Sequence, residues 1–452
     1  MVNSVFSYDE FVISADKKEV SFYFTITKDS ERHSFTETFR FDTALIDCLE
    51  TYRLLRALHL ASGISYYKIF VSQEIEHPYA MSTREADFWN TVFRKGLGEF
   101  LLVNKLQPSE LALFGPQEGH DTQNTSRATL SPKVLLGIGG GKDSIVAGEL
   151  LKSLDLPVSG FVLATGSATG QTHEVAKIMK INMHTIERTV DSSLILLQER
   201  PDAYKGHIPV SVLFALTGCM LAVSTRSSYV VVANESSTSI PRAEWAGESV
   251  NHQWSKSFDF EKMLQAYIND YVSSQLVYFS AIRPLSSVAV SKIFCKYPEY
   301  FESYTSDNYA FRVDPNKRPD GRWSLESPKT LSSFILMSAW LSEDQLVAMF
   351  GRNFLNEPSL EPLFLSLIGI EGELPLDCVG TPEELRASLG QAYKHGTCID
   401  SVLMGVAEKY EIVANDRTIA PIAEKFLGVA DEHAFPDALA HALTIKIKEA
   451  LS

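Results

Sequence analysis

The chain has 452 residues, enough for about three domain-sized units at roughly 150 residues each. Lys and Arg total 41 against 56 Asp and Glu, and the formal charge of -15 argues against general nucleic-acid binding, although a local basic cleft stays compatible with it. With 45% hydrophobic and 21% charged residues the composition is that of an ordinary globular protein, which excludes disordered, collagen-like and coiled-coil classes.

The five cysteines are widely spaced and include no C-x-x-C pair, which disfavours a disulfide scaffold and a Cys-rich zinc site and fits a reducing compartment. The N-terminal residues lack a basic segment followed by an apolar one, so no secretory signal is expected. Residues 206–225 contain no Lys, Arg, Asp or Glu, but Pro, Gly, Ser and His interrupt them. We therefore predict a buried helix there, and a cytoplasmic protein without a membrane segment.

The N-terminal part of the chain predicts an α+β domain over residues 1–128. Residues 20–27 and 33–41 alternate apolar and polar side chains and are separated by a polar turn, which predicts a β-hairpin. Helical periodicity follows over residues 43–62 and 83–101. A polar stretch rich in turn formers then closes this domain.

From residue 129 the pattern changes to short apolar strands that alternate with helices, which is typical of a parallel α/β sheet. The expected strands cover residues 134–138, 158–163, 183–186 and 229–233. The expected helices between them cover residues 144–153, 171–180, 192–198 and 210–224. We place this α/β domain at residues 129–297 and a mostly helical region, which ends in an apolar helix at 437–451, at residues 298–452.

A glycine-rich loop follows the first expected strand. Gly139, Gly140 and Gly141 precede a helix, so free backbone N–H groups and the positive end of the helix dipole converge on one point that suits a phosphate. The spacing does not match Walker A, because Asp143 stands where that motif has Ser or Thr. It does not match G-x-G-x-x-G either, because Lys142 replaces the third glycine. A simple strand-to-helix turn is the alternative interpretation.

The segment Gly139–Ser144 resembles the S-G-G-x-D-S loop of the PP-loop ATP pyrophosphatases, with Gly139 in place of the first Ser. Members of that superfamily cleave ATP between its α- and β-phosphates and adenylate a substrate. The resemblance implies a parallel-sheet PP-loop fold, ATP and Mg²⁺ as cofactors, and nucleotide contacts from the loop glycines, Lys142, Asp143 and Ser144. Asp143 is the first candidate for a ligand of the metal.

Polar residues follow two other expected strands. Thr165 comes after the second strand, and Asn234, Glu235 and Ser236 come after the fourth. Because ligands of open parallel sheets bind beyond the carboxyl ends of the strands, we expect these residues near the glycine loop. In the superfamily the end of the second strand lies near adenine and ribose. For the residues after the fourth strand, a turn with a helix cap is the alternative.

The polar sequence at residues 244–257 brings donors for phosphate or carboxylate together with a histidine able to move protons near neutral pH. Its candidates for a catalytic role are His252 and Lys256. A single histidine is more often structural, but its place after the glycine loop favours a role in the site. His207 is a further candidate.

Several segments together resemble the UDP-N-acetylmuramoyl-L-alanyl-L-glutamate epimerases. These segments are the glycine loop and residues 65–68, 96–100, 206–209, 234–236, 250–257 and 378–384. The resemblance implies an enzyme of peptidoglycan precursor synthesis whose substrate is a small molecule, UDP-MurNAc-L-Ala-L-Glu, and which inverts the terminal glutamate while ATP becomes AMP and pyrophosphate.

This activity is chemically coherent with the loop. Joining the glutamate carboxylate to AMP removes its charge and makes the neighbouring Cα–H more acidic, so that a base can remove the proton and reprotonation from the other face gives the D centre. Backbone amides, Mg²⁺ and Lys142 would offset charge on the leaving pyrophosphate. His252 is the first candidate for the base, and Glu235 and His207 are alternatives among which the sequence does not choose.

One departure and two alternatives stay open. Where relatives have W-C-x-x-C-x-K-C, this chain has Ser and Thr in place of the cysteines over Trp323–Thr330, and these are poor zinc ligands. The first alternative is another adenylating ligase or an RNA-modifying enzyme of the PP-loop superfamily. The second is a nucleotide-binding relative that does not turn over. The sequence predicts no oligomeric state.

Overall fold

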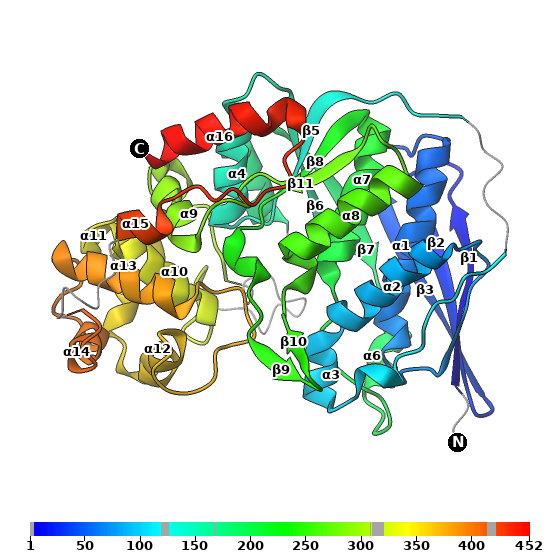
Figure 1. Cartoon of the computed structure of the whole chain (residues 1–452), viewed down its shortest axis with the longest axis horizontal. Coiled ribbons are helices and arrows are strands. Elements are labelled where there is room, and N and C mark those ends of the chain that lie inside the picture. The colour runs from blue at the N-terminus through cyan, green and yellow to red at the C-terminus, as the bar shows by residue number, and fades with distance from the viewer. Residues whose placement is uncertain (1–3, 119–125, 167–168, 308, 310–320, 414–421) are drawn as a thin grey trace.

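The computed structural model describes residues 4–118, 126–166, 169–307, 309, 321–413 and 422–452 (Figure 1). A nine-stranded sheet crosses the molecule in the order β11-β8-β5-β6-β7-β3-β2-β1-β4. Its strands are β1 (Ser4–Ile13), β2 (Glu19–Lys28), β3 (Glu31–Phe41), β4 (Glu74–Glu76), β5 (Ser131–Gly137), β6 (Val158–Ala164), β7 (Asn182–Thr189), β8 (Ser227–Val232) and β11 (Val277–Ser280). A separate two-stranded ribbon consists of β9 (Ala243–Trp245) and β10 (Glu248–Val250).

The five strands from β11 to β7 are parallel, which confirms the predicted α/β class with a mostly parallel sheet. The four strands expected in this region form as β5, β6, β7 and β8, within a few residues of the expected bounds. The edge strand β11 was not predicted. It has only four residues, too few for a pattern of alternation to be recognised in the sequence.

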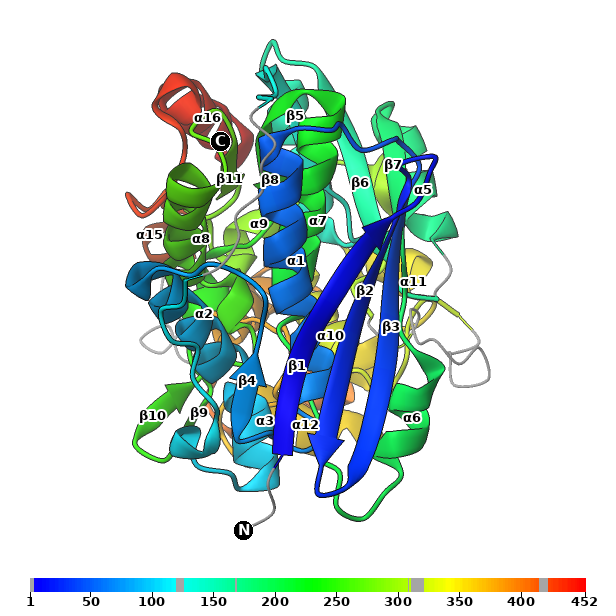
Figure 2. The ribbon, with the colours of Figure 1, turned by 90° about the vertical axis from the view of Figure 1, so that its right-hand side faces the viewer.

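The N-terminal strands belong to the same sheet. The predicted hairpin forms as β2 and β3, and β3 pairs antiparallel with β7, from Thr38 opposite Thr189 to Phe41 opposite Ile186. Figure 2 shows β1, β2 and β3 as long twisted strands beside β7. The hydrogen-bonded ladder therefore continues from the N-terminal region into the α/β region. The division at residues 128 and 297 stays a prediction.

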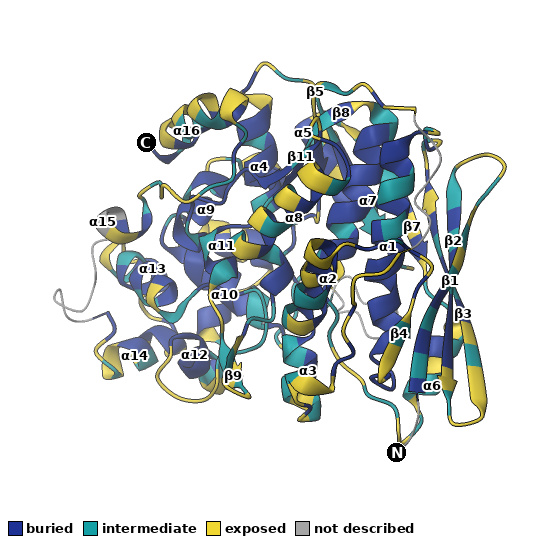
Figure 3. Cartoon of the chain, turned by 45° about the vertical axis from the view of Figure 1, so that its right-hand side comes forward, coloured by how far each residue is buried: buried dark blue, intermediate teal, exposed yellow. Residues whose placement is uncertain are grey.

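Helices cover both faces of the sheet because successive side chains of a strand point to opposite faces. In β5, Leu135 joins the hydrophobic cluster on one face, and Val134 and Leu136 join the cluster on the other. The longer helices that contribute to the first cluster include α1 (Leu49–Tyr67), α2 (Thr83–Gly96), α3 (Gly98–Asn104), α7 (Val210–Thr225) and α8 (Phe258–Tyr271). Those that begin the second are α4 (Lys142–Lys152), α5 (Gly170–Met179) and α9 (Ser287–Phe294). Figure 3 shows buried residues on the facing sides of these layers.

The C-terminal region is mostly helical over its described residues, as predicted. Its helices are α10 (Pro328–Ser338), α11 (Glu343–Phe350), α12 (Glu361–Leu367), α13 (Pro382–Lys394), α14 (Val402–Lys409), α15 (Ile422–Phe426) and α16 (Asp437–Leu451). They contribute to the same cluster as α4 and α9. The short helix α6 (Ser192–Gln198) forms where it was expected.

The apolar helix α7 is buried, as predicted, because it packs against α1 and against the sheet. Apolar side chains on all its faces suit such a position between two layers. None of the described helices is both long enough and apolar enough to cross a membrane. Close approach to the sheet requires Gly218, since a Cβ atom there would lie 2.5 Å from Cζ of Phe161.

We expect Gly218→Ala to lower the free energy of unfolding by about 1–3 kcal/mol, because the added methyl group overpacks this contact. The matched control is Gly405→Ala in α14, where a Cβ would meet no atom within 4 Å. That change should raise stability by about 0.5–1 kcal/mol through the helix propensity of alanine. Urea denaturation followed by circular dichroism measures both, and equal effects of the two variants would contradict the prediction.

Candidate functional site

A cavity of about 350 Å³ lies at the carboxyl ends of β5 and β8. Its lining includes the glycine loop after β5, the polar residues after β8 and, from the C-terminal region, parts of α10 and residues 378–380. The volume is within the usual range for small-molecule sites, roughly 300–1,000 Å³. The structure thus brings together, at one sheet edge, two segments that the sequence places about 90 residues apart.

The glycine loop leaves backbone accessible at the start of α4. Gly140 has φ +82°, a conformation that favours glycine, and a Cβ atom on Gly139 would meet no atom within 4 Å. Gly141 is the N-cap residue of α4, and it has no side chain that could accept a hydrogen bond from the N–H groups of the first turn. Thr305 N–H donates to the Gly140 carbonyl and fixes the turn. This geometry suits an anion at the helix N-terminus.

Lys142 is the buried cation of the loop. Its Nζ donates to the Asp143 carboxylate at 2.5 Å. Burial lowers the pKa of Lys142, but the carboxylates of Asp143, Glu235 and Glu384 raise it more, so the net pKa is above its ordinary value. Lys142 therefore stays charged, and it offers its positive charge beside the helix N-terminus.

Two carboxyl groups, Glu235 and Glu384, interact electrostatically with this lysine. Glu235 Oε1 accepts hydrogen bonds from the hydroxyls of Ser237 and Ser287, the latter at 2.6 Å. Glu384 Oε1 accepts from the Ser287 N–H at 2.7 Å. Burial, reinforced by the charge of Glu235, raises the pKa of Glu384 to about 7. Glu384 can therefore hold a proton near neutral pH.

The segment after β8 is fixed by one buried guanidinium. Arg283 is 1% exposed, and its Nε donates to Glu261 at 2.9 Å. Its Nη1 donates to the Glu235 carbonyl and to the Thr238 hydroxyl, each at 2.9 Å. Its Nη2 donates to the Lys256 carbonyl at 2.7 Å. Arg283 thereby holds the residues after β8 and the turn at residues 254–256 in a fixed relation.

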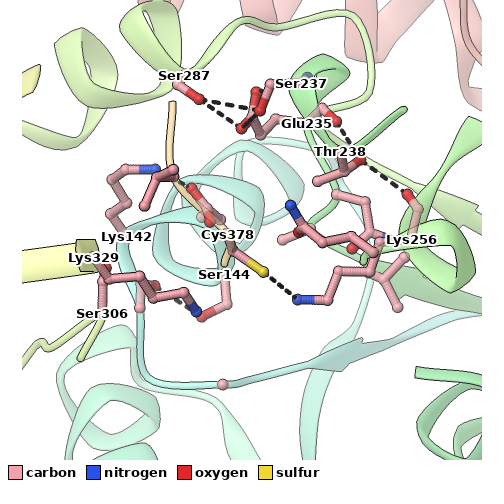
Figure 4. A pocket seen from close by; sticks show the side chains of 18 of the residues that line it. Lys142, Ser144, Glu235, Ser237, Thr238, Lys256, Ser287, Ser306, Lys329 and Cys378 are labelled. Carbon is pink, nitrogen blue, oxygen red and sulfur yellow. Dashed lines mark hydrogen bonds and ion pairs between the residues drawn. The ribbon is translucent and has the colours of Figure 1, made fainter. Parts of the chain in front are cut away.

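Lys256 and Cys378 meet inside the cavity, where the Lys256 ammonium donates to the Cys378 sulfur at 3.5 Å (Figure 4). The Cys378 sulfur raises the pKa of Lys256 above its ordinary value, against the opposing effect of burial. In the view of Figure 4, Lys142 and Lys329 lie on the other side of the thiol from Lys256. Three lysines thus line this cavity of an acidic chain.

The two candidate histidines lie together, with ring centroids 4.5 Å apart. His252 Nδ1 is hydrogen-bonded to the Glu99 carboxylate, which fixes the orientation of its ring. Burial, with a further contribution from His252, lowers the pKa of His207 to about 4, so His207 is neutral at physiological pH. The buried Lys68 donates to the carbonyl of Gly206, the residue before His207.

Two groups of side chains have donors suited to a divalent transition metal. Glu99, His207 and His252 each place one ligand atom within 4.8 Å of the others, and His252, Asp377 and Cys378 form a second such group. For the harder Mg²⁺, carboxylate oxygens are the preferred ligands, and Asp143 and Glu235 supply them in the cavity lining.

One polar atom in the lining has no hydrogen-bond partner among the described residues. Gln253 is 5% exposed, and its amide oxygen Oε1 is buried without a donor. Such an atom is usually satisfied by a ligand, an ion or water. The cavity therefore has an accessible helix N-terminus, cations for phosphate and an unmatched acceptor, which fits a nucleotide and a magnesium ion.

Most of the predicted site residues reach this cavity. Those that line it are Gly139, Gly141, Lys142, Asp143, Ser144, Asn234, Glu235 and Lys256. Those outside the lining are Gly140, Thr165, His207, Ser236 and His252. Sequence reasoning assigned no role to Glu99, Arg283, Lys329, Cys378 or Glu384. For Glu99, Cys378 and Glu384 a signal existed, because they lie in segments that resemble the epimerases.

The segment Trp323–Thr330 is held by a buried carboxylate. Asp307 is fully buried, and its Oδ2 accepts from Ser324 N–H at 2.7 Å and from the Thr330 hydroxyl at 3.2 Å. Ser324 and Thr330, two of the three hydroxyl residues of this segment, thus form a hydrogen-bonded cluster with Asp307, whereas the buried hydroxyl of Ser327 has no hydrogen-bond partner among the described residues. This cluster positions Lys329 and α10 at the edge of the cavity.

Arg283→Met should lower the free energy of unfolding by about 3–5 kcal/mol, because it leaves the charge of Glu261 buried without its partner. Arg84→Met is the matched control, since Arg84 pairs with Asp270 at the surface, and its side chain is 74% exposed. An exposed pair contributes no more than about 1 kcal/mol. Chemical denaturation of both variants measures the difference, and a mild effect of Arg283→Met would show that the buried pair is not essential.

Two family models match the sequence, the MurL N-terminal domain over residues 2–281 and the MurL C-terminal domain over residues 303–417. Three similar proteins carry the name UDP-N-acetyl-alpha-D-muramoyl-L-alanyl-L-glutamate epimerase. The protein from Micromonospora sp. is 30% identical over 75% of this chain and 74% of its own length. The protein from Salinispora tropica is 29% identical over 75% and 72%, and that from Xanthomonas oryzae pv. oryzae is 28% identical over 85% and 84%.

Proposed function

This chain belongs to the MurL family, and from that premise we propose that it is an ATP-dependent epimerase acting on UDP-MurNAc-L-Ala-L-Glu in peptidoglycan precursor synthesis. It inverts the terminal L-Glu to D-Glu and releases AMP and pyrophosphate. The observation that carries the proposal is the convergence of the glycine loop, Lys142 and Lys256 on one cavity. A parallel sheet with this loop between β5 and α4 supports the PP-loop assignment.

The loop and its neighbours are assigned to ATP. The N–H groups at the start of α4 and the Lys142 ammonium bind the phosphates, and Asn234 lies at the same edge for the nucleoside. Thr165 and Ser236, outside the cavity lining, are proposed as further nucleotide contacts. Asp143 is the proposed ligand of Mg²⁺, which supplies a Lewis acid that offsets charge on the leaving pyrophosphate.

The substrate carboxylate is assigned to the side of the cavity where Lys256 lies. Adenylation neutralises this carboxylate, and the neighbouring Cα–H becomes acidic enough for a protein base. His252 is the proposed base, because the Glu99 carboxylate orients its ring and stabilises the imidazolium that forms. The alternatives are weaker: Glu235 is engaged by two serine hydroxyls, and the lowered pKa of His207 makes it a poor acceptor.

The direct test incubates the protein with ATP, Mg²⁺ and UDP-MurNAc-L-Ala-L-Glu, and then determines the configuration of the glutamate and the pyrophosphate released.

Asp143→Ala should abolish AMP formation without unfolding the chain. Asp259→Ala is its control, since Asp259 is also in the first turn of a helix, α8, but its side chain is 81% exposed. Unchanged turnover in Asp143→Ala would remove the loop from the mechanism.

His252→Ala should still form the adenylate and release pyrophosphate, but it should exchange the glutamate α-hydrogen with deuterated solvent roughly 10²–10⁴-fold more slowly. The comparison variant is His441→Ala, at an exposed position of α16. Mass spectrometry of the recovered dipeptide measures the exchange. An exchange rate equal to that of the wild type would assign the base to another residue.

The same measurements distinguish the alternatives. A nucleotide-binding relative without turnover would bind ATP and release no pyrophosphate in the presence of the substrate. Another adenylating enzyme of the superfamily, such as an amide-forming ligase or an RNA-modifying enzyme, would release pyrophosphate only with its own substrate. The acidic charge and the isolated cysteines disfavour an RNA-modifying thiolase.

A further inference from the structure

Cys378 is a thiol inside the candidate site to which the mechanism above assigns no role. It is half-buried, and it lines the same cavity as Gly139 and Lys142. The other four cysteines, Cys48, Cys219, Cys295 and Cys398, are not part of this lining. Its placement, within reach of the group that the loop would activate, is therefore particular to Cys378.

A cation and a potential base both lie beside this thiol. The Lys256 ammonium lies 3.5 Å from the sulfur and attracts negative charge on it (Figure 4). One ring nitrogen of His252 lies within 4.8 Å of the sulfur, and His252 Nδ1 is hydrogen-bonded to Glu99. A thiol, a base and a carboxylate that orients the base are the three parts that nucleophilic catalysis requires.

The separation of Cys378 and His252 decides between two roles for the thiol. Two groups that exchange protons with opposite faces of one carbon approach it to about 3–3.5 Å each, and therefore stand roughly 6–7 Å apart. The sulfur of Cys378 and the nitrogen of His252 are within 4.8 Å, which is too close for such a pair. They are placed instead to act in succession on the same side of the substrate.

We propose that Cys378 is a catalytic nucleophile that takes the glutamyl group from AMP as a thioester, an inference that rests on the proposed function. The thiol proton passes to His252 and on to solvent. The sulfur attacks the carbonyl carbon of the glutamyl adenylate, a C–S bond forms, and the C–O bond to AMP breaks with its electron pair leaving on AMP. The substrate class is an acyl adenylate of a peptide terminus.

The thioester then carries the epimerisation. A thioester carbonyl withdraws electrons strongly from Cα, and the short tether holds Cα beside Cys378, where His252, having passed the thiol proton to solvent, can remove the proton of Cα. Solvent returns a proton to the opposite face, and water then cleaves the C–S bond to restore the thiol and release the carboxylic acid. The sum consumes one ATP and one water and yields AMP, pyrophosphate and the inverted peptide.

Covalent capture tests this step. Wild-type protein mixed with ATP, Mg²⁺ and UDP-MurNAc-L-Ala-L-Glu is quenched in acid and analysed by intact mass and peptide mapping. We expect an adduct with the mass of the substrate less one water, on the peptide that contains Cys378, and its removal by neutral hydroxylamine. Inversion by the wild type without any such adduct would overturn the proposal.

Two variants test whether the thiol itself is required. Cys378→Ala and Cys378→Ser should lose inversion by more than about 100-fold, yet keep substrate-dependent ATP–pyrophosphate exchange, because adenylation precedes the thioester. Serine keeps the shape but not the nucleophilicity of cysteine, so a structural role would be rescued by Cys378→Ser. The control is Cys48→Ser at the N-cap of α1, where Ser is a favoured residue.

Alkylation gives an independent measurement. Burial raises the pKa of the thiols of Cys219 and Cys295, so both should react slowly with iodoacetamide. We expect Cys378 to be labelled first, with loss of inversion and with protection by ATP plus substrate. Activity that survives complete labelling of Cys378 would overturn the proposal.

The remaining outcomes are also decisive. If the wild type inverts no glutamate and releases no pyrophosphate, the proposed function itself fails. If the wild type inverts glutamate and Cys378→Ala inverts it equally well, the proposed function stands and only the thioester is overturned. If chelation stops inversion, and Zn²⁺ but not Mg²⁺ restores it, then His252, Asp377 and Cys378 hold a metal, and the thioester is overturned. If Cys378→Ala also loses ATP–pyrophosphate exchange, the thiol serves adenylation and not acyl transfer.

Discussion

The site depends on one buried cation, the guanidinium of Arg283. It joins Glu261 of α8 to the backbone of the segment after β8 and to the carbonyl of Lys256. A buried charge is tolerated only when its hydrogen bonds are all made, so the positions of these groups are set together and not one by one. The edge of the cavity that contains Glu235 and Lys256 is accordingly a rigid unit.

The charge of the cavity opposes that of the chain. An acidic molecule of formal charge -15 places Lys142, Lys256 and Lys329 around one cavity, where they can hold an anionic nucleotide against the overall field. The carboxyl groups of Glu235 and Glu384 balance these cations, and the raised pKa of Glu384 lets the balance change by one proton near neutral pH. Local charge, and not the net value, therefore governs what the cavity can bind.

Features encoded within a short stretch could be predicted from the sequence, whereas those made by distant segments could not. The glycine loop, the hairpin and α7 follow from local patterns of glycine, alternation and continuous apolar residues. Arg283 meets Glu261 only when segments more than 20 residues apart come together. Lys256 meets Cys378 only when segments more than 120 residues apart come together. Glu99 was in a recognised segment, but its hydrogen bond to His252 depends on the packing of α3 and not on spacing in the chain.

The continuous sheet also constrains the order in which the chain can be assembled. β3 finds its second partner, on the side toward the centre of the sheet, only in β7, which is synthesised after the whole of β5 and β6. At 5–20 residues per second the hairpin of β2 and β3 leaves the ribosome on the order of 10 s before that partner exists. Through this interval an edge of unpaired backbone groups is exposed, so nascent chains are most open to misassociation before β7 has been synthesised.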